Sequence, residues 1–388
     1  MKSNDIKKLD LFAGAGGFSL GFVNAGFKPG VMIDFWQPAV ETLEKNFCSS
    51  GGYALEKDLK SYTPKELSND LKNLNIDDSF DLIIGGPPCQ GWSSIGRAKL
   101  KSLGVGHHSI FEDPRNNMFK NFFKFVKFYQ PKVFVMENVS GMLKFNGVNA
   151  AKVIEGYFEK HEYVVTCSLL NAVDFGVPQS RRRLFFVGVR KDLGIEFEMP
   201  KSTLKNGKAK FPMVSVNEAI GDLPAIKDGS RNWVMKYKKP VTFSNYVGLM
   251  RKKIKGDILS DHVCRGHREE DIEAFRFLKQ GRRYSDLPER LKRYRDDIFK
   301  DKYRKLQSNS YSNCVTAHLS KDCYSHIHPT QARTISVREA ARLQSFPDHY
   351  FFASEGMTTK FKLIGNAVPP LLGEVVAREV KRQIFDKL

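Results

Sequence analysis

The stretch "DLFAGAGGFSLGF", residues 10–22, decides the fold class. A short apolar strand ends at a turn that contains Gly14, Gly16 and Gly17, and the apolar residues after the turn begin a helix. Glycines allow the backbone to approach a ligand closely and to adopt positive φ angles. A strand, a glycine-rich turn and a helix in this order are typical of nucleotide-binding α/β folds, NAD enzymes included. We therefore expect a cofactor at this turn.

The rest of the first 190 residues continues the alternation of strands and helices. Apolar runs that predict strands occupy residues 28–36, 80–88, 132–139, 162–172 and 183–190. The aromatic-rich stretch at residues 116–130 has helical spacing and ends before Pro131. This alternation is typical of an α/β domain.

Beyond about residue 190 the chain becomes basic, rich in loops and poor in regular periodicity. The helical pattern resumes at "RTISVREAARLQSF", and an amphipathic stretch follows the turn "GNAVPP" near the end of the chain. We predict an α/β domain formed by residues 1–190 and 331–388, whose sheet is completed by the C-terminal segment. A smaller domain, residues 191–330, is inserted into it.

The charge of the chain points to a polyanionic partner. The net charge is +19, and residues 181–330 hold 33 Lys and Arg against 18 Asp and Glu. Such an excess favours nucleic acid or an anionic membrane surface. No run approaches the ~18 apolar residues that a membrane span needs. The start has no apolar signal segment, and the six cysteines are scattered without a C-x-x-C pair, so we expect an intracellular protein.

A second informative stretch is "DLIIGGPPCQGWSS", residues 81–94, in which two glycines and two prolines lead to Cys89. One interpretation is a turn with an inert cysteine, and the other is a nucleophile on a rigid support. Glu137 ends the next predicted strand, and neighbouring parallel strands bring their carboxyl ends to one edge of a sheet. In "QSRRRLFFVG", Arg181 and Arg183 alternate and therefore point the same way. These four residues are candidates for one cleft.

Two acids follow strands near the glycine turn. Asp34 ends the second strand, where a carboxylate can accept hydrogen bonds from a ribose diol. Asp58 lies about two dozen residues later, where it could accept from an adenine amino group. Either acid is equally compatible with an ordinary turn residue after a strand.

Taken together, these motifs resemble those of the DNA (cytosine-5) methyltransferases. The matching stretches are "DLFAGAGGFSLGF", "GGPPCQGWS", "ENVSG", "QSRRRLFFVG", "REAARLQSFPD" and "IGNAVPP", in the order of that family. The resemblance implies a Rossmann-like S-adenosylmethionine-dependent methyltransferase sheet and a target-recognition, DNA-binding domain at residues 191–330. It also implies S-adenosyl-L-methionine as the cofactor and double-stranded DNA as the partner.

The resemblance also assigns residues to the cofactor. It gives Asp34 to the ribose, Phe35 to the adenine face and Asp58 to the adenine amino group. Asn366 and Val368 would close the pocket from the C-terminal segment. The remaining cofactor positions are Phe12, Ala13, Gly14, Gly16, Gly17, Leu59 and Pro88.

The implied chemistry follows from the weak nucleophilicity of cytosine C5. Attack of Cys89 on C6 makes C5 able to accept the methyl group, and Glu137 protonates or hydrogen-bonds N3. Arg183, together with Arg181, holds O2 and stabilises the developing charge. The target base must be flipped out of the duplex for this to happen.

Several alternatives stay open from the sequence. The leading hypothesis is the modification enzyme of a prokaryotic restriction–modification system, a monomer in the cytoplasm at the nucleoid, with a restriction endonuclease as functional partner. The alternatives are an RNA (tRNA) cytosine-5 methyltransferase and a catalytically silent DNA-binding homologue. Zinc-ligand residue types occur at residues 262–267 and 314–328, but their spacing lacks a C-x-x-C knuckle. We therefore predict no metal.

Overall fold

The computed structural model describes residues 6–88, 118–143, 149–202, 204–205, 208–209, 213–237, 244–254, 256–295, 302–354 and 356–388. The described chain divides into two compact units. Unit 1 comprises residues up to 171 together with residues 182–201 and 372–388, and unit 2 comprises residues 172–181 and 202–371.

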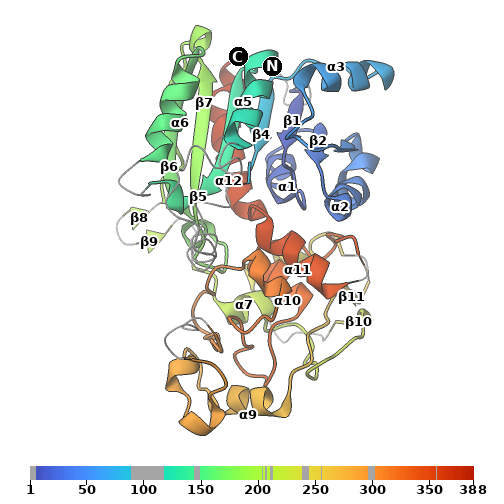
Figure 1. Cartoon of the computed structure of the whole chain (residues 1–388), viewed down its shortest axis with the longest axis vertical. Coiled ribbons are helices and arrows are strands. Elements are labelled where there is room, and N and C mark those ends of the chain that lie inside the picture. The colour runs from blue at the N-terminus through green and yellow to red at the C-terminus, as the bar shows by residue number, and fades with distance from the viewer. Residues whose placement is uncertain are drawn as a thin grey trace. The chain divides into compact units, whose positions relative to one another are not determined.

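A seven-stranded sheet forms the centre of unit 1, with the order β3-β2-β1-β4-β5-β7-β6. Its strands are β1 Lys8–Leu11, β2 Val31–Asp34, β3 Tyr53–Glu56, β4 Leu82–Gly85, β5 Val133–Val139, β6 Tyr163–Asn171 and β7 Arg182–Arg190. The five strands β1 to β5 pair in parallel, and β7 runs antiparallel to both β5 and β6. The predicted α/β fold class is confirmed (Figure 1).

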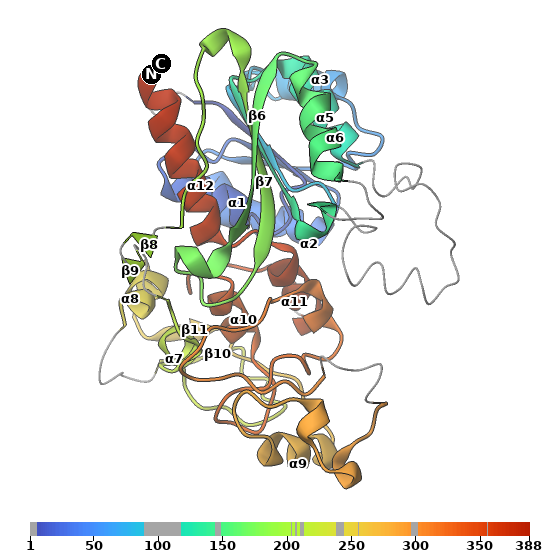
Figure 2. The same ribbon diagram turned by 90° about the vertical axis from the view of Figure 1, so that its left-hand side faces the viewer.

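Helices cover both faces of this sheet. The helices with most of their residues in unit 1 are α1 Gly17–Asn24, α2 Gln37–Phe47, α3 Pro64–Asn73, α5 Met118–Tyr129, α6 Ala150–Glu159 and α12 Pro370–Gln383. Figure 2 shows α5 and α6 on one face, with α1 and α12 on the other. Strands covered on both faces are apolar throughout, as the buried Leu82, Ile83 and Ile84 of β4 illustrate.

Unit 2 is built from short helices and long connections. Its regular elements are α7 Val216–Ile220, α8 Asn245–Arg251, α9 Glu269–Phe277, α10 Val337–Leu343, α11 Met357–Asn366, and the short strands β8 Leu204–Lys205, β9 Lys208–Ala209, β10 Val234–Lys236 and β11 Ile258–Ser260. Buried arginines of α10 pair with acids, Arg342 with Asp348 and Arg338 with Asp261. Ion pairs of this kind are tolerated in an interior because each charge has a partner.

Residues 331–371, which the sequence analysis groups with residues 1–190, belong to unit 2 by their contacts. The C-terminal residues 372–388 belong to unit 1, where Phe385 packs edge-on against Phe27 with ring centroids 5.8 Å apart. Within the described part of the chain, none of the helices is long and apolar enough to cross a membrane.

Candidate active site

The glycine-rich turn lies at the carboxyl end of β1 in unit 1. Phe12, Gly14 and Gly16 have φ angles of 59°, 55° and 72°, so the backbone is left-handed at three positions. Such angles cost a residue with a Cβ about 1 kcal/mol or more, which explains the glycines. The turn leads into α1, whose first turn holds no acidic residue. No acidic side chain of the first turn therefore neutralises the positive end of this helix dipole.

Asp34 fixes the shape of this turn. Its Oδ2 accepts a hydrogen bond from the Gly14 amide at 2.8 Å, and its Oδ1 accepts one from the Trp36 amide at 3.0 Å. The side chain therefore connects the end of β2 with both the glycine turn and the start of α2. The contact of Asp34 with a ribose diol stays a prediction.

The other predicted cofactor residues of unit 1 lie on the adjoining loops. The ring of Phe35 is 63% exposed, directly after the buried Asp34. Asp58 is exposed and accepts a hydrogen bond from the Lys60 amide at 3.0 Å, while Leu59 is buried. Ala13 and Gly17 are buried, and Pro88 is exposed at the end of the described stretch. An exposed aromatic ring beside a buried acid suits a flat heterocycle attached to a ribose.

A buried polar group beneath the turn was not predicted. Lys8 donates to the Ser19 hydroxyl at 2.8 Å, and that hydroxyl donates to Asp10 at 2.6 Å. Burial raises the pKa of Asp10 to about 6 and lowers that of Lys8 to about 8, and each charge partly offsets the shift of the other. The sequence could have indicated this group, because Lys8 and Asp10 are two residues apart in a strand and therefore share one of its faces. This group ties β1 to α1 on either side of the turn.

Glu137 and Arg183 form an ion pair in unit 1. Glu137 lies near the end of β5, and its Oε1 is 2.9 Å from Nε of Arg183 at the start of β7. Both side chains are mostly buried. The position of Glu137 opposite the end of β4 is shown by Gly86, where an added Cβ would lie 3.3 Å from Oε2 of Glu137. Glu137 therefore lies beside Gly86, and Gly86 precedes Cys89 by three residues in the chain.

Arg181 has a different environment, in unit 2. Its side chain is 2% exposed and donates to the carbonyls of Val315 at 2.7 Å, Gly365 at 3.3 Å and Ala367 at 2.8 Å. The guanidinium also lies 3.4 Å from the sulfur of Cys314. These hydrogen bonds connect the segment of Arg181 with the segment around Val315 and with the end of α11. A role for Arg181 at cytosine O2 stays a prediction.

Two buried glutamines extend this network. Gln179 donates to the Leu343 carbonyl at 2.7 Å and to the side chain of Gln344, and it accepts from the Val315 amide at 3.0 Å. Gln344 donates to the carbonyls of Ile364 and Ala367 at 3.1 and 2.7 Å. The three motifs "QSRRR", "RLQSF" and "IGNAV" therefore meet in unit 2. Sequence reasoning did not assign these glutamines, although both lie inside motifs that it quoted.

Three further predictions concern Cys89, Asn366 and Val368. Cys89 lies outside the described residues. Asn366 is exposed at the end of α11, and Val368 is buried two residues later, both in unit 2. Their contact with a cofactor stays a prediction. Among the described residues, no group of three or more His, Cys, Asp or Glu side chains has an arrangement that could hold a metal ion.

Comparisons with known proteins agree with these motifs. A family model described as C-5 cytosine-specific DNA methylase matches residues 6–382. The type II methyltransferase M1.HphI of Haemophilus parahaemolyticus is 35% identical, over 96% of this chain and 86% of the relative. M.DdeI of Desulfomicrobium norvegicum is 34% identical, over 96% of this chain and 88% of the relative.

Among solved structures, one described as a prophage-encoded DNA modification methyltransferase of E. coli matches with a TM-score of 0.76. It is 26% identical and covers 98% of this chain and 100% of its own. With the strand order given above, this likeness confirms the predicted type of sheet.

Proposed function

Since the chain belongs to the C-5 cytosine-specific DNA methylase family, we propose that it methylates C5 of a flipped-out cytosine in duplex DNA through a covalent bond between Cys89 and C6. The observation that carries this proposal is the Glu137–Arg183 pair at 2.9 Å, next to the strand end that leads to Cys89. A silent homologue would have no need to retain these groups together.

The residues of unit 1 fit S-adenosylmethionine as the methyl donor. The glycine turn and the start of α1 would hold the polar end of the cofactor, Asp34 would hold the ribose hydroxyls, and the exposed ring of Phe35 would contact the adenine. Asp58 accepts from the adenine amino group. When bound, the cofactor supplies an electrophilic methyl group.

The chain's own residues prepare cytosine to accept that group. The thiolate of Cys89 adds to C6, and the electron pair of the C5–C6 double bond becomes available at C5. Glu137 protonates or hydrogen-bonds N3, while Arg183 donates to O2, so that the charge which develops on the ring is stabilised. C5 would bond to the methyl carbon as the bond from that carbon to the sulfonium sulfur breaks, and the electron pair of the broken bond would leave with the sulfur. Loss of the C5 proton to a base would then restore the C5–C6 double bond and expel the thiolate of Cys89.

The recognition of DNA is assigned to the inserted region. We assign catalysis to residues 1–190 and 331–388, and target recognition to the basic residues 191–330. Base flipping costs a few kcal/mol, and contacts between basic side chains and phosphates offset this cost. The relatives named as type II methyltransferases support a role in restriction–modification, with an endonuclease as functional partner. We further propose that the protein acts as a monomer at the nucleoid.

A methyl-transfer assay tests the proposal. The purified protein is incubated with isotope-labelled S-adenosylmethionine and unmethylated genomic DNA, and the nucleosides are then separated. We expect label in 5-methylcytosine, and cytosine-methylation mapping of the same DNA then gives the target sequence. C89S should transfer no label while it binds the cofactor like the wild type. Label in tRNA but not in DNA would favour the RNA alternative, and cofactor binding without any transfer would favour the silent homologue.

A further inference from the structure

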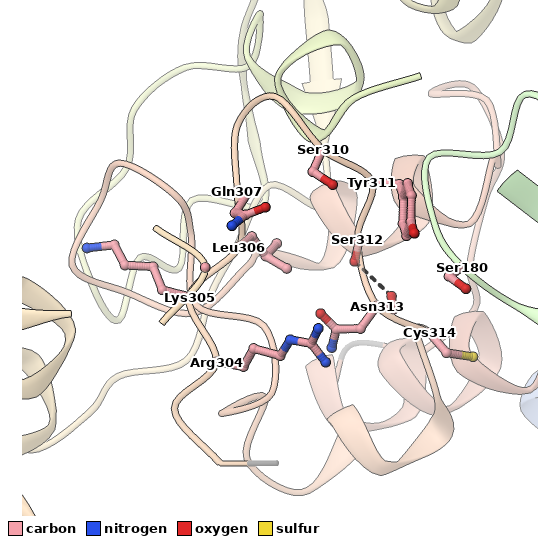
Figure 3. A pocket seen from close by; sticks show the side chains of 11 residues that line it. Ser180, Arg304, Lys305, Leu306, Gln307, Ser310, Tyr311, Ser312, Asn313 and Cys314 are labelled. Atoms are coloured by element: carbon pink, nitrogen blue, oxygen red, sulfur yellow. Dashed lines mark hydrogen bonds between the residues drawn. The ribbon is translucent and has the colours of Figure 1, made fainter. Parts of the chain in front are cut away.

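The structure assigns a second nucleotide-binding subsite to unit 2: we propose that the cavity between residues 304 and 314 holds one nucleotide of the bound DNA other than the target cytosine. This inference rests on the proposed function and names a contact through which that function would become sequence-specific. The cavity has a volume of about 440 Å³, within the range of small-molecule sites. Figure 3 shows the side chains that line it.

The charge of the cavity selects an anionic ligand. Arg304 lines it with an exposed guanidinium that has no carboxylate partner among the described residues. Lys305 also lines the cavity, but its ammonium group is engaged elsewhere, since it donates to the Phe275 carbonyl at 2.8 Å. Of the described residues that line the cavity, none is acidic. Among the described residues that line the cavity, a phosphate at Arg304 would therefore meet a cation and no carboxylate.

The remaining lining groups suit a base. Tyr311 is 43% exposed, and aromatic faces are platforms on which nucleobases stack. Asn313 donates its amide to the Ser325 carbonyl at 3.0 Å, so its side-chain oxygen remains as an acceptor for an amino group of a base. The side chains of Gln307 and Ser310 add further polar groups to the wall.

The backbone around the cavity is already fixed. The Ser312 amide donates to the Pro178 carbonyl at 2.9 Å, and the Ser180 amide donates to the Ser312 carbonyl at 2.8 Å. On the other side, the Arg304 amide donates to the Tyr324 carbonyl at 3.0 Å. A site whose backbone is held in this way loses little conformational entropy when it binds. The two hydrogen bonds that join Ser312 to Pro178 and Ser180 also place the cavity next to the segment that carries Arg181.

A scan of modified duplexes tests the subsite. The target duplex, as mapped for the wild type, is prepared with one abasic nucleotide or one neutral methylphosphonate linkage at each position in turn, and binding is measured by fluorescence anisotropy. We expect one position at which base removal weakens wild-type binding by about 5- to 150-fold, the range for loss of one stacked base. In Y311A, removal of the base at that position should no longer weaken binding, while its effect at all other positions should be unchanged. In Y311F, which keeps the aromatic ring, removal of the base should weaken binding as in the wild type.

The phosphate contact has its own variant and control. In R304Q, the neutral methylphosphonate linkage at the same nucleotide should no longer weaken binding. R276Q removes an equal charge from the exposed face of α9, and in this control the neutral linkage should weaken binding as in the wild type. Circular dichroism verifies that the variants are folded. The subsite would be overturned, and the proposed function left intact, if the wild type methylates DNA and every modification weakens the binding of Y311A and R304Q as much as that of the wild type. A wild type that binds no duplex would overturn both.

Discussion

At the scale of single residues, the Glu137–Arg183 pair is the centre of the account. A carboxylate and a guanidinium at 2.9 Å, both largely removed from water, hold each other in one orientation. That fixed orientation is what a group needs in order to place a hydrogen bond on a bound base. We therefore expect substitutions in this pair to lower kcat and to leave the affinity for the cofactor nearly unchanged.

Replacing Glu137 with glutamine should lower kcat about 10²- to 10⁴-fold, because the amide cannot transfer a proton to N3. The affinity for S-adenosylmethionine should change less than twofold, because Asp34 and the glycine turn are untouched. Steady-state kinetics and isothermal titration calorimetry measure the two quantities. E198Q, in an exposed glutamate of the same unit, serves as the control. An E137Q variant with more than a third of the wild-type kcat would exclude Glu137 from the chemistry.

The sequence made Glu137, Arg181 and Arg183 candidates for one cleft but could not separate Arg183 from Arg181. Alternation along a strand places both arginines on one face, and nothing local distinguishes them. Their environments differ because Arg181 is bonded to the carbonyls of Val315, Gly365 and Ala367, which are more than 130 residues away in the chain. The roles of both arginines stay predictions.

At the scale of elements, the close approach of α11 to the short 3₁₀ helix Ala317–Ser320 depends on one glycine. A Cβ at Gly365 would lie 2.2 Å from the backbone carbon of Thr316 and 2.2 Å from the Ala317 nitrogen. Backbone atoms cannot move aside as a flexible side chain can, so this position excludes any larger residue.

The G365A variant should therefore be destabilised by about 1–3 kcal/mol through overpacking. G248A, on the exposed face of α8 where an added Cβ meets nothing within 4 Å, should be stabilised by about 0.5–1 kcal/mol. Urea unfolding of both variants measures the difference. Equal stabilities would show that α11 does not pack at this distance.

Much of the element order followed from the sequence. The apolar runs predicted the strands β2, β4, β5, β6 and β7. For the interior strands the reason is that a strand buried on both faces is continuously apolar, whereas β6 lies at the edge of the sheet and is only partly buried. The strand order and the antiparallel direction of β7 did not follow, because pairing depends on contacts between distant segments. That residues 331–371 belong to unit 2 could not be predicted either, because it too depends on contacts between distant segments.

At the scale of the whole molecule, buried histidines make unit 2 sensitive to mild acid. Burial lowers the pKa of both His326 and His328 to about 4. His328 is held neutral by geometry as well, because its Nδ1 accepts from the amides of Thr330 and Gln331 at 3.2 and 3.1 Å. Between pH 6.5 and 4 the unfolded chain binds protons that the folded chain does not, so stability falls as the pH falls.

The H328N variant should lose part of this pH dependence. The asparagine oxygen can accept the same amide hydrogens but does not titrate. The wild type should lose about 3 kcal/mol through His328 between pH 6.5 and 4, and H328N should lose correspondingly less. Denaturant unfolding at half-unit pH steps gives both curves. Parallel curves over this window would contradict a buried, neutral His328.

The central claim is that Cys89 attacks C6 of cytosine, and a duplex whose target cytosine carries fluorine at C5 tests it most directly. Fluorine cannot leave C5 as a proton does, so the enzyme should stay bonded to the base after methyl transfer. With S-adenosylmethionine present, mass spectrometry should detect a one-to-one adduct that survives denaturation, with the DNA attached to the peptide that contains Cys89. A preparation that methylates the unmodified duplex yet forms no adduct, or forms it at another residue, would contradict the account.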